Sequence, residues 1–213
     1  MFPLGSVLFP AMPLPLRVFE ERYLQMLAEV LQHEQPEFGV VLIERGQEVG
    51  GGDLRFDTGT IARIADLQVS ENEVTLVGLG GPRFEVVEWG ADDPFPRAEI
   101  RLLDELVWDE SHRDLLQDAE RTVRSGLTIA SEYVDLAWSP SIELAESPVD
   151  AAWQLAAIAP LGPMDQVELL KASSVQDLLT RLIEVTTASV DSIRFSWTDA
   201  TDAPDAPDDQ ETP

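Results

Sequence analysis

The stretch that decides the fold is FPLGSVLFPAMPLPLRVFE, residues 2–20, in which short apolar runs are separated by prolines. Proline has no backbone N–H to donate and is excluded from central strands, so the runs at residues 6–9 and 14–19 are predicted to be edge strands or extended segments. Residues 20–33 follow with apolar side chains at helical spacing and with Pro36 beyond their end. This pattern predicts a helix directly after the second run.

Several further strands are predicted in the part of the chain that ends near residue 107. Strand-like segments occur at residues 38–43, 60–69 and 98–107. Two more runs, at residues 73–79 and 83–89, flank a segment rich in glycine and proline, which predicts a hairpin that turns at residues 78–82. About six short strands favour a small barrel or a sandwich.

The periodicity changes to that of helices after about residue 108. Helices are predicted at residues 116–134, 151–158, 164–171 and 175–193. Ser174 and Asp177 have the spacing of a capping box at the start of the last helix. Residues 108–197 are therefore expected to form a small helical bundle beside the β-rich part, and residues 198–213 a disordered acidic tail.

The charge of the chain is strongly negative, with 40 acidic residues against 14 basic ones and a formal net charge of −26 over 213 residues. Such a surface repels phosphate backbones and anionic lipids, and it suits basic or apolar partners. The alternative is that the acidity serves solubility or salt adaptation and reflects no partner. The apolar N-terminus lacks the basic region of a signal peptide and is interrupted by prolines, so a cytoplasmic protein is expected. We expect neither nucleic acid nor membrane as a partner.

The residues give no pattern typical of a catalytic, cofactor or metal site. The chain has no cysteine, and its two histidines, His33 and His112, have no second ligand at a metal-binding spacing. Neither a G-x-S-x-G nor a G-x-x-x-x-G-K-[ST] segment occurs, and the single lysine, Lys171, lies in an amphipathic segment. The glycine-rich residues 46–52 are predicted to form a loop between strands, because no helix that could complete a phosphate site begins after them.

The order of several short motifs resembles the N-terminal substrate-recognition domain of Lon-type proteases. The segments that carry the resemblance are residues 2–10 (FPLGSVLFP), 14–20 (LPLRVFE) followed by Arg22 and Tyr23, 38–43 (FGVVLI), 46–50 (GQEVG), 58–62 (TGTIA), 81–84 (GPRF), 155–161 and 166–170. The resemblance implies an α+β fold, with a PUA-like pseudo-β-barrel over residues 1–107 followed by a C-terminal α-helical bundle over residues 108–197. It also implies recognition of a substrate or partner without ATP hydrolysis or proteolysis.

Five residues are candidates for a peptide-binding surface: Phe9, Met12, Arg17, Phe19 and Arg83. An exposed apolar patch beside arginines would accept an extended segment of a client protein. The alternative for the apolar members of this set is burial in the core.

The charged residues of these motifs also have a structural interpretation. An arginine–carboxylate pair among Arg17, Glu20, Arg22 and Arg83 could tie the strand-to-helix junction to the turn at residues 82–84.

The function that the sequence favours is a non-catalytic module that binds unfolded or extended protein segments and presents them to a separate protease or chaperone. Two alternatives come from other classes. One is a small-molecule or enzymatic pocket of unknown chemistry. The other is RNA binding, which the PUA-like fold suggests and the negative charge opposes.

Overall fold

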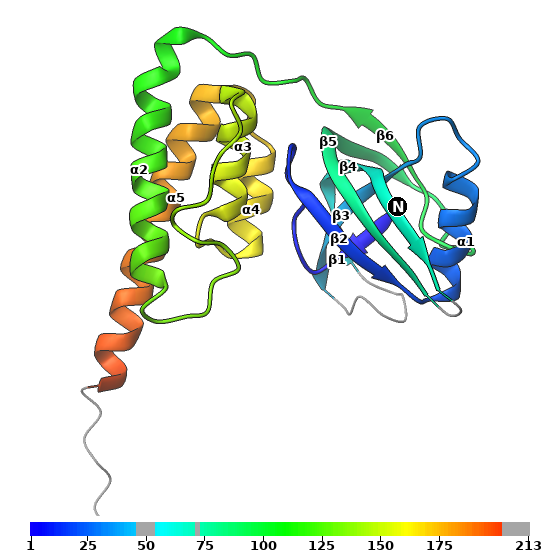
Figure 1. Cartoon of the computed structure of the whole chain (residues 1–213), viewed down its shortest axis with the longest axis horizontal. Coiled ribbons are helices and arrows are strands. Elements are labelled where there is room, and N and C mark those ends of the chain that lie inside the picture. Colours follow the sequence, from blue (N-terminus) through cyan, green and yellow to red (C-terminus); the bar gives the residue numbers. More distant parts are fainter. Residues whose placement is uncertain (46–53, 71–72, 202–213) are drawn as a thin grey trace, which may run out of the picture.

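A curled six-stranded sheet forms the first half of the chain in the computed structural model, which describes residues 1–45, 54–70 and 73–201 (Figure 1). The strands are β1 (Phe2–Leu4), β2 (Pro13–Val18), β3 (Glu37–Arg45), β4 (Leu54–Val69), β5 (Val74–Trp89) and β6 (Ala98–Leu102). Their order is β1-β3-β4-β5-β2, and β6 pairs with β5 as well. The sheet is mixed, because β1 runs parallel to β3 whereas the other pairs are antiparallel.

Strand β2 is an edge of the sheet, as its prolines predict. The Met12 carbonyl, just before β2, accepts a hydrogen bond of 2.9 Å from the backbone N–H of Gly80 in β5. Since the backbone groups of alternate residues point to opposite sides of a strand, Pro13 and Pro15 face the free edge, where no donor is required. The strand expected at residues 6–9 is not formed; these residues are irregular, and β1 lies before them.

The hairpin predicted at residues 78–82 is wrong, because β5 passes through this segment without turning. Strand β2 pairs with the first part of β5 and β6 with the last part. Glycine is required here because neighbouring backbone passes very close to the strand. A Cβ on Gly80 would lie 2.0 Å from the Phe9 carbonyl oxygen, and one on Gly59 in β4 would lie 2.1 Å from the Val40 carbonyl oxygen. Glycine is common both in turns and in strands that another backbone segment approaches closely, so the glycine-rich pattern alone could not distinguish a turn from a strand.

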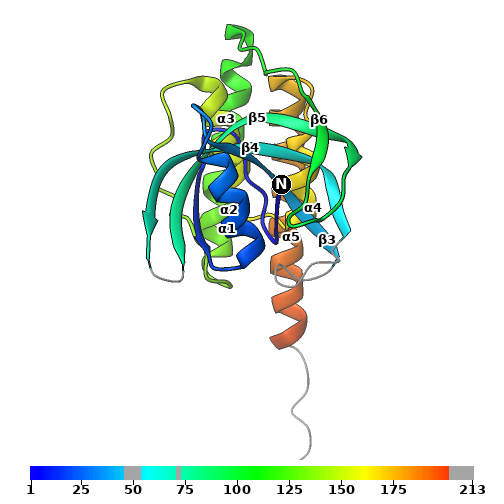
Figure 2. The ribbon, with the colours of Figure 1, turned by 90° about the vertical axis from the view of Figure 1, so that its right-hand side faces the viewer.

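Helix α1 (Glu21–Val30) lies on the side of the sheet away from the later helices (Figures 1 and 2). It buries Tyr23, Met26 and Leu27. The Tyr23 ring stacks on that of Phe2 in β1, with centroids 4.2 Å apart. The predicted helix is confirmed, and it ends at Val30, a little earlier than expected.

Four longer helices follow the sheet: α2 (Arg113–Ala130), α3 (Pro148–Ile158), α4 (Pro163–Leu170) and α5 (Val175–Thr201), with a short 3-10 turn, η1 (Glu110–His112), before α2. Helices α2 and α5 pack closely at Gly126 of α2. A Cβ at this position would lie 3.1 Å from the Thr186 side chain and 3.2 Å from the Val190 side chain of α5. At the start of α5 the Ser174 hydroxyl accepts from the N–H of Asp177, as the capping pattern predicts. Helix α5 continues to Thr201, beyond the predicted end near residue 193, so residues 198–201 are helical and do not belong to the predicted disordered tail. Residues 202–213 lie outside the described residues.

The sheet and the helices share one continuous core, which joins Phe9 and Leu76 from the first half to Leu155 and Leu178 from the second. A smaller cluster lies within the sheet, around Phe84. Among the helices in the described part of the chain, none is both long and apolar enough to cross a membrane.

Candidate functional site

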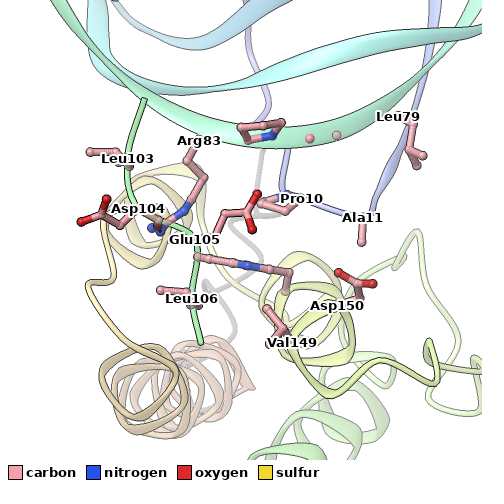
Figure 3. A pocket seen from close by; sticks show the side chains of 14 residues that line it. Pro10, Ala11, Leu79, Arg83, Leu103, Asp104, Glu105, Leu106, Val149 and Asp150 are labelled. Atoms are coloured by element: carbon pink, nitrogen blue, oxygen red, sulfur yellow. The ribbon is translucent and has the colours of Figure 1, made fainter. Parts of the chain in front are cut away.

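A cleft of about 520 Å³ lies between the sheet and the helices (Figure 3). Four segments that are distant in the sequence form its walls. They are the turn before β2, the middle of β5, the segment after β6 and the first turns of α3. The lining residues are Pro10, Ala11, Leu79, Gly80, Gly81, Pro82, Arg83, Leu103, Asp104, Glu105, Leu106, Val149, Asp150 and Trp153.

The cleft opens where the outer edge of β5 changes partner. Pairing with β2 reaches Leu79, and pairing with β6 begins at Phe84. At one end of this gap the Gly80 carbonyl accepts from the N–H of Ala11, and Ala11 has a positive φ of 59°. This arrangement is a bulge of the kind in which the first residue is left-handed, and it turns the chain away from β5.

Arg83 is the joint between the sheet and the helices. Its side chain is buried although it is charged, with 5% of the residue exposed. One terminal nitrogen, Nη1, donates to the carbonyls of Leu170 and Ala172 at 2.8 and 2.7 Å, and the other, Nη2, donates to the Asp104 carbonyl at 2.6 Å.

The partners of Arg83 explain why a cation is needed at this position. Helix α4 ends at Leu170, so the carbonyls around its last turn have no partner within the helix. The last turn of α4 contains no basic residue. Arg83 supplies both the missing donors and a positive charge at the negative end of the helix dipole. Burial lowers the pKa of Arg83 and the nearby Asp104 charge opposes this shift, but arginine starts so high that the group stays cationic.

The floor of the cleft is Trp153 of α3, with 3% of the residue exposed. Its ring meets that of Phe9, with centroids 6.0 Å apart. The Arg83 guanidinium carbon lies 4.8 Å from the centroid of the same ring. A cation over an indole face adds attraction to the packing, so these three side chains form one cluster that links both halves of the chain.

The walls of the cleft are acidic. Asp104 and Glu105 are exposed on the segment after β6, and Asp150 is half-buried in the first turn of α3 (Figure 3). Within the described residues, neither the Glu105 nor the Asp150 carboxylate takes part in an ion pair or a side-chain hydrogen bond. Three acidic residues and one arginine therefore line the cleft, and the guanidinium of that arginine already donates to three carbonyls.

The structure divides the five residues predicted for a peptide-binding surface among different places. Phe9 and Met12 are buried in the core, and Arg83 is buried at the base of the cleft. Arg17 and Phe19 are exposed and line a separate hollow of about 210 Å³ between β1 and β2. Trp153 brings Phe9 and Arg83 together, whereas Arg17 pairs with Glu73 at 2.5 Å.

The charged pairs differ in detail from the predicted link between the strand-to-helix junction and the turn. Glu20 pairs with Arg22 at 3.1 Å, which is contact within the junction itself. Arg83 does not form the predicted arginine–carboxylate pair with the junction; it donates to backbone carbonyls and ties the sheet to the helices.

Sequence reasoning missed Trp153, Glu105 and Asp150. A weak signal for one of them exists, because Ser147 and Pro148 are typical of a helix start and place Asp150 in the first turn of α3. The glycine-rich loop predicted at residues 46–52 lies outside the described residues. The described part of the chain contains no group of three or more histidine, cysteine or acidic side chains placed to hold a metal ion.

Comparison with known proteins gives one consistent result. The family model of the ATP-dependent protease La (LON) substrate-binding domain matches residues 1–188. The Lon protease of Anaeromyxobacter dehalogenans is 33% identical over 104 residues, which cover 47% of this chain and 12% of that protein. The chain therefore spans only about an eighth of the length of the first curated relatives that it matches, at 12% and 13%.

Solved structures agree with the fold. The Lon N-terminal domain protein from Xanthomonas campestris is 26% identical with a TM-score of 0.61, and the match covers 86% of this chain and 95% of that one. The N-terminal domain of the Mycobacterium avium complex Lon protease has a TM-score of 0.58 over 87% of this chain and 96% of that one, and its identity of 16% makes it a similarity of fold alone.

Proposed function

The chain belongs to the family of the ATP-dependent protease La (LON) substrate-binding domain, and from this premise we propose that it is a non-catalytic module that binds unfolded or extended protein segments in the cleft between the sheet and the helices. The proposal assigns no catalytic residue, cofactor or metal to the chain. The proposed setting is the cytoplasm, where the bound segment would be presented to a separate protease or chaperone.

The proposal includes a division of the chain into parts. Residues 1–107 are regarded as a PUA-like pseudo-β-barrel and residues 108–197 as an α-helical bundle, whose last helix continues to Thr201. The curl of the six-stranded sheet supports the first part (Figure 1). The mutual packing of α2, α3, α4 and α5 around shared core residues supports the second.

The observation that carries the proposal is the chemistry of the cleft. Its volume of about 520 Å³ lies in the range of roughly 300–1,000 Å³ that is typical of ligand sites. Apolar side chains from both walls, such as Pro10, Leu79 and Val149, remain partly exposed within it. A cleft open to solvent and lined in this way accepts a few side chains of an extended segment. A small molecule is the rival ligand for the same space, whereas the acidic walls oppose RNA.

The absence of cysteine allows a direct test. A single Leu79→Cys substitution places an environment-sensitive dye at the rim of the cleft, since Leu79 is 48% exposed. The matched control is Gln117→Cys on the exposed surface of α2. Titration with a permanently unfolded polypeptide should shift the emission of the dye at position 79 and leave that at position 117 unchanged. Equal responses at both positions, or a response only to small molecules, would overturn the proposal.

A further inference from the structure

We infer that the cleft prefers segments in which a basic side chain lies two residues from an apolar one, and that Glu105 and Asp150 determine this preference. The inference rests on the proposed function, because it names the class of segment that the same cleft would take. Membership of the family does not specify the charge of the bound segment.

The carboxylates of Glu105 and Asp150 both line the cleft. Glu105 belongs to the segment that follows β6, and Asp150 belongs to α3, so they reach the cleft from different elements (Figure 3). The backbone N–H of Asp150 is held by the Ser147 hydroxyl at 3.4 Å, which fixes this residue in the first turn of α3. A ligand that enters the cleft meets both carboxylates near the apolar side chains of the walls.

Glu105 and Asp150 have no basic side chain among the described residues of the cleft available to pair with their carboxylates. Arg83 is the only basic residue among those that line the described cleft, and it donates to the carbonyls of Leu170, Ala172 and Asp104. Its guanidinium cannot turn toward Glu105 or Asp150 without leaving those carbonyls unsatisfied. The two carboxylates are therefore available for a positive charge supplied by the ligand.

Successive side chains of an extended segment point in opposite directions and advance by about 3.3 Å each, so residues i and i+2 lie on the same face roughly 6.6 Å apart. Trp153 and Leu106 are buried at the floor of the cleft. Pro10, Leu79 and Val149 are among the apolar side chains of its lining that remain partly exposed. A segment with the pattern basic–x–apolar can place its charge at the carboxylates while its apolar side chain contacts these exposed side chains.

The experiment measures binding of labelled peptides of equal length by fluorescence anisotropy. Three peptides share the same leucines and differ only at the positions two residues away, which carry lysine, serine or glutamate. Two partly exposed ion pairs should make the lysine peptide bind about tenfold more tightly than the serine peptide at low salt. The advantage should shrink to about twofold at 0.5 M salt, where the screening length is only about 4 Å.

Variants separate the cleft from the general negative charge of the protein. Glu105→Gln with Asp150→Asn should reduce the lysine advantage to about twofold, whereas the control pair Asp114→Asn with Glu132→Gln, exposed on and beside α2, removes the same charge and should retain the full advantage. Glu105→Lys should favour the glutamate peptide over the lysine peptide. Circular dichroism of each variant confirms that it is folded.

The outcomes distinguish the inference from the proposed function. If the serine peptide binds and the lysine advantage is the same in both variant pairs, the charge preference is overturned while segment binding stands. If no peptide binds at all, segment binding itself fails. A lysine advantage that disappears equally in the control pair would also overturn the inference, because general electrostatic attraction would then explain it.

Discussion

Replacement of Arg83 by alanine is expected to destabilise the protein by about 3–5 kcal/mol, because three carbonyls would lose their donor and each buried unsatisfied group costs about 1–3 kcal/mol. The guanidinium donates three hydrogen bonds to backbone carbonyls, and each bond from a charged donor contributes about 1.5–3 kcal/mol. The cost of burying the cation offsets part of this sum. The variant would leave the carbonyls at the end of α4 without donors and would remove the contact with Trp153.

Urea unfolding followed by far-UV circular dichroism and by tryptophan fluorescence measures this loss. Arg83→Lys should lose roughly half as much, because an ammonium keeps the charge but cannot match the planar fork that reaches three carbonyls. The control is Arg101→Ala in β6, whose side chain is 63% exposed and pairs with Glu85, and it should cost less than about 1 kcal/mol. If Arg83→Ala costs no more than Arg101→Ala, Arg83 does not join the sheet to the helices.

Two further substitutions test close packing and a buried polar atom by the same unfolding measurement. Gly80→Ala should destabilise the protein by at least about 2 kcal/mol, because its Cβ would lie 2.0 Å from the Phe9 carbonyl oxygen. The control is Gly81→Ala, whose Cβ would have its nearest contact at 3.5 Å and which should change stability by less than about 0.5 kcal/mol. Equal effects of the two substitutions would refute the crowding at Gly80. Thr186→Val should stabilise the protein by about 1 kcal/mol, because the buried Thr186 hydroxyl has no hydrogen-bond partner among the described residues. A loss of stability on this change would mean that the hydroxyl has a partner after all.

The parts of the fold that follow from local pattern could be predicted from the sequence. The prolines of residues 13–15 mark β2 as an edge, and the apolar spacing after residue 20 gives α1. Helix positions in the second half follow from the same spacing, and the hydroxyl of Ser174 marks the start of α5. Each of these features depends on residues that are neighbours in the chain.

The parts that depend on contacts between distant segments could not be predicted. Gly80 belongs to a strand because the Phe9 carbonyl passes close to it, and nothing near Gly80 in the sequence reveals that approach. The cleft is similar, since Ala11, Arg83, Glu105 and Asp150 meet there only after the sheet and the helices have packed. The sequence singled out Arg83 but could not identify its partners, which are backbone carbonyls without a side-chain signature.

The cluster of Phe9, Arg83 and Trp153 that joins the two halves also contributes the floor of the cleft. Trp153 contacts both Phe9 and Arg83 of the first half of the chain, so the floor exists only while the sheet and the helices are packed together. A segment that contacts both walls binds only this packed state, and it therefore stabilises the junction by mass action. Substitutions at Arg83 or Trp153 would weaken binding through the joint even if neither side chain met the ligand. Residues of the rim and walls, such as Leu79 and Glu105, are consequently the positions at which binding can be separated from stability.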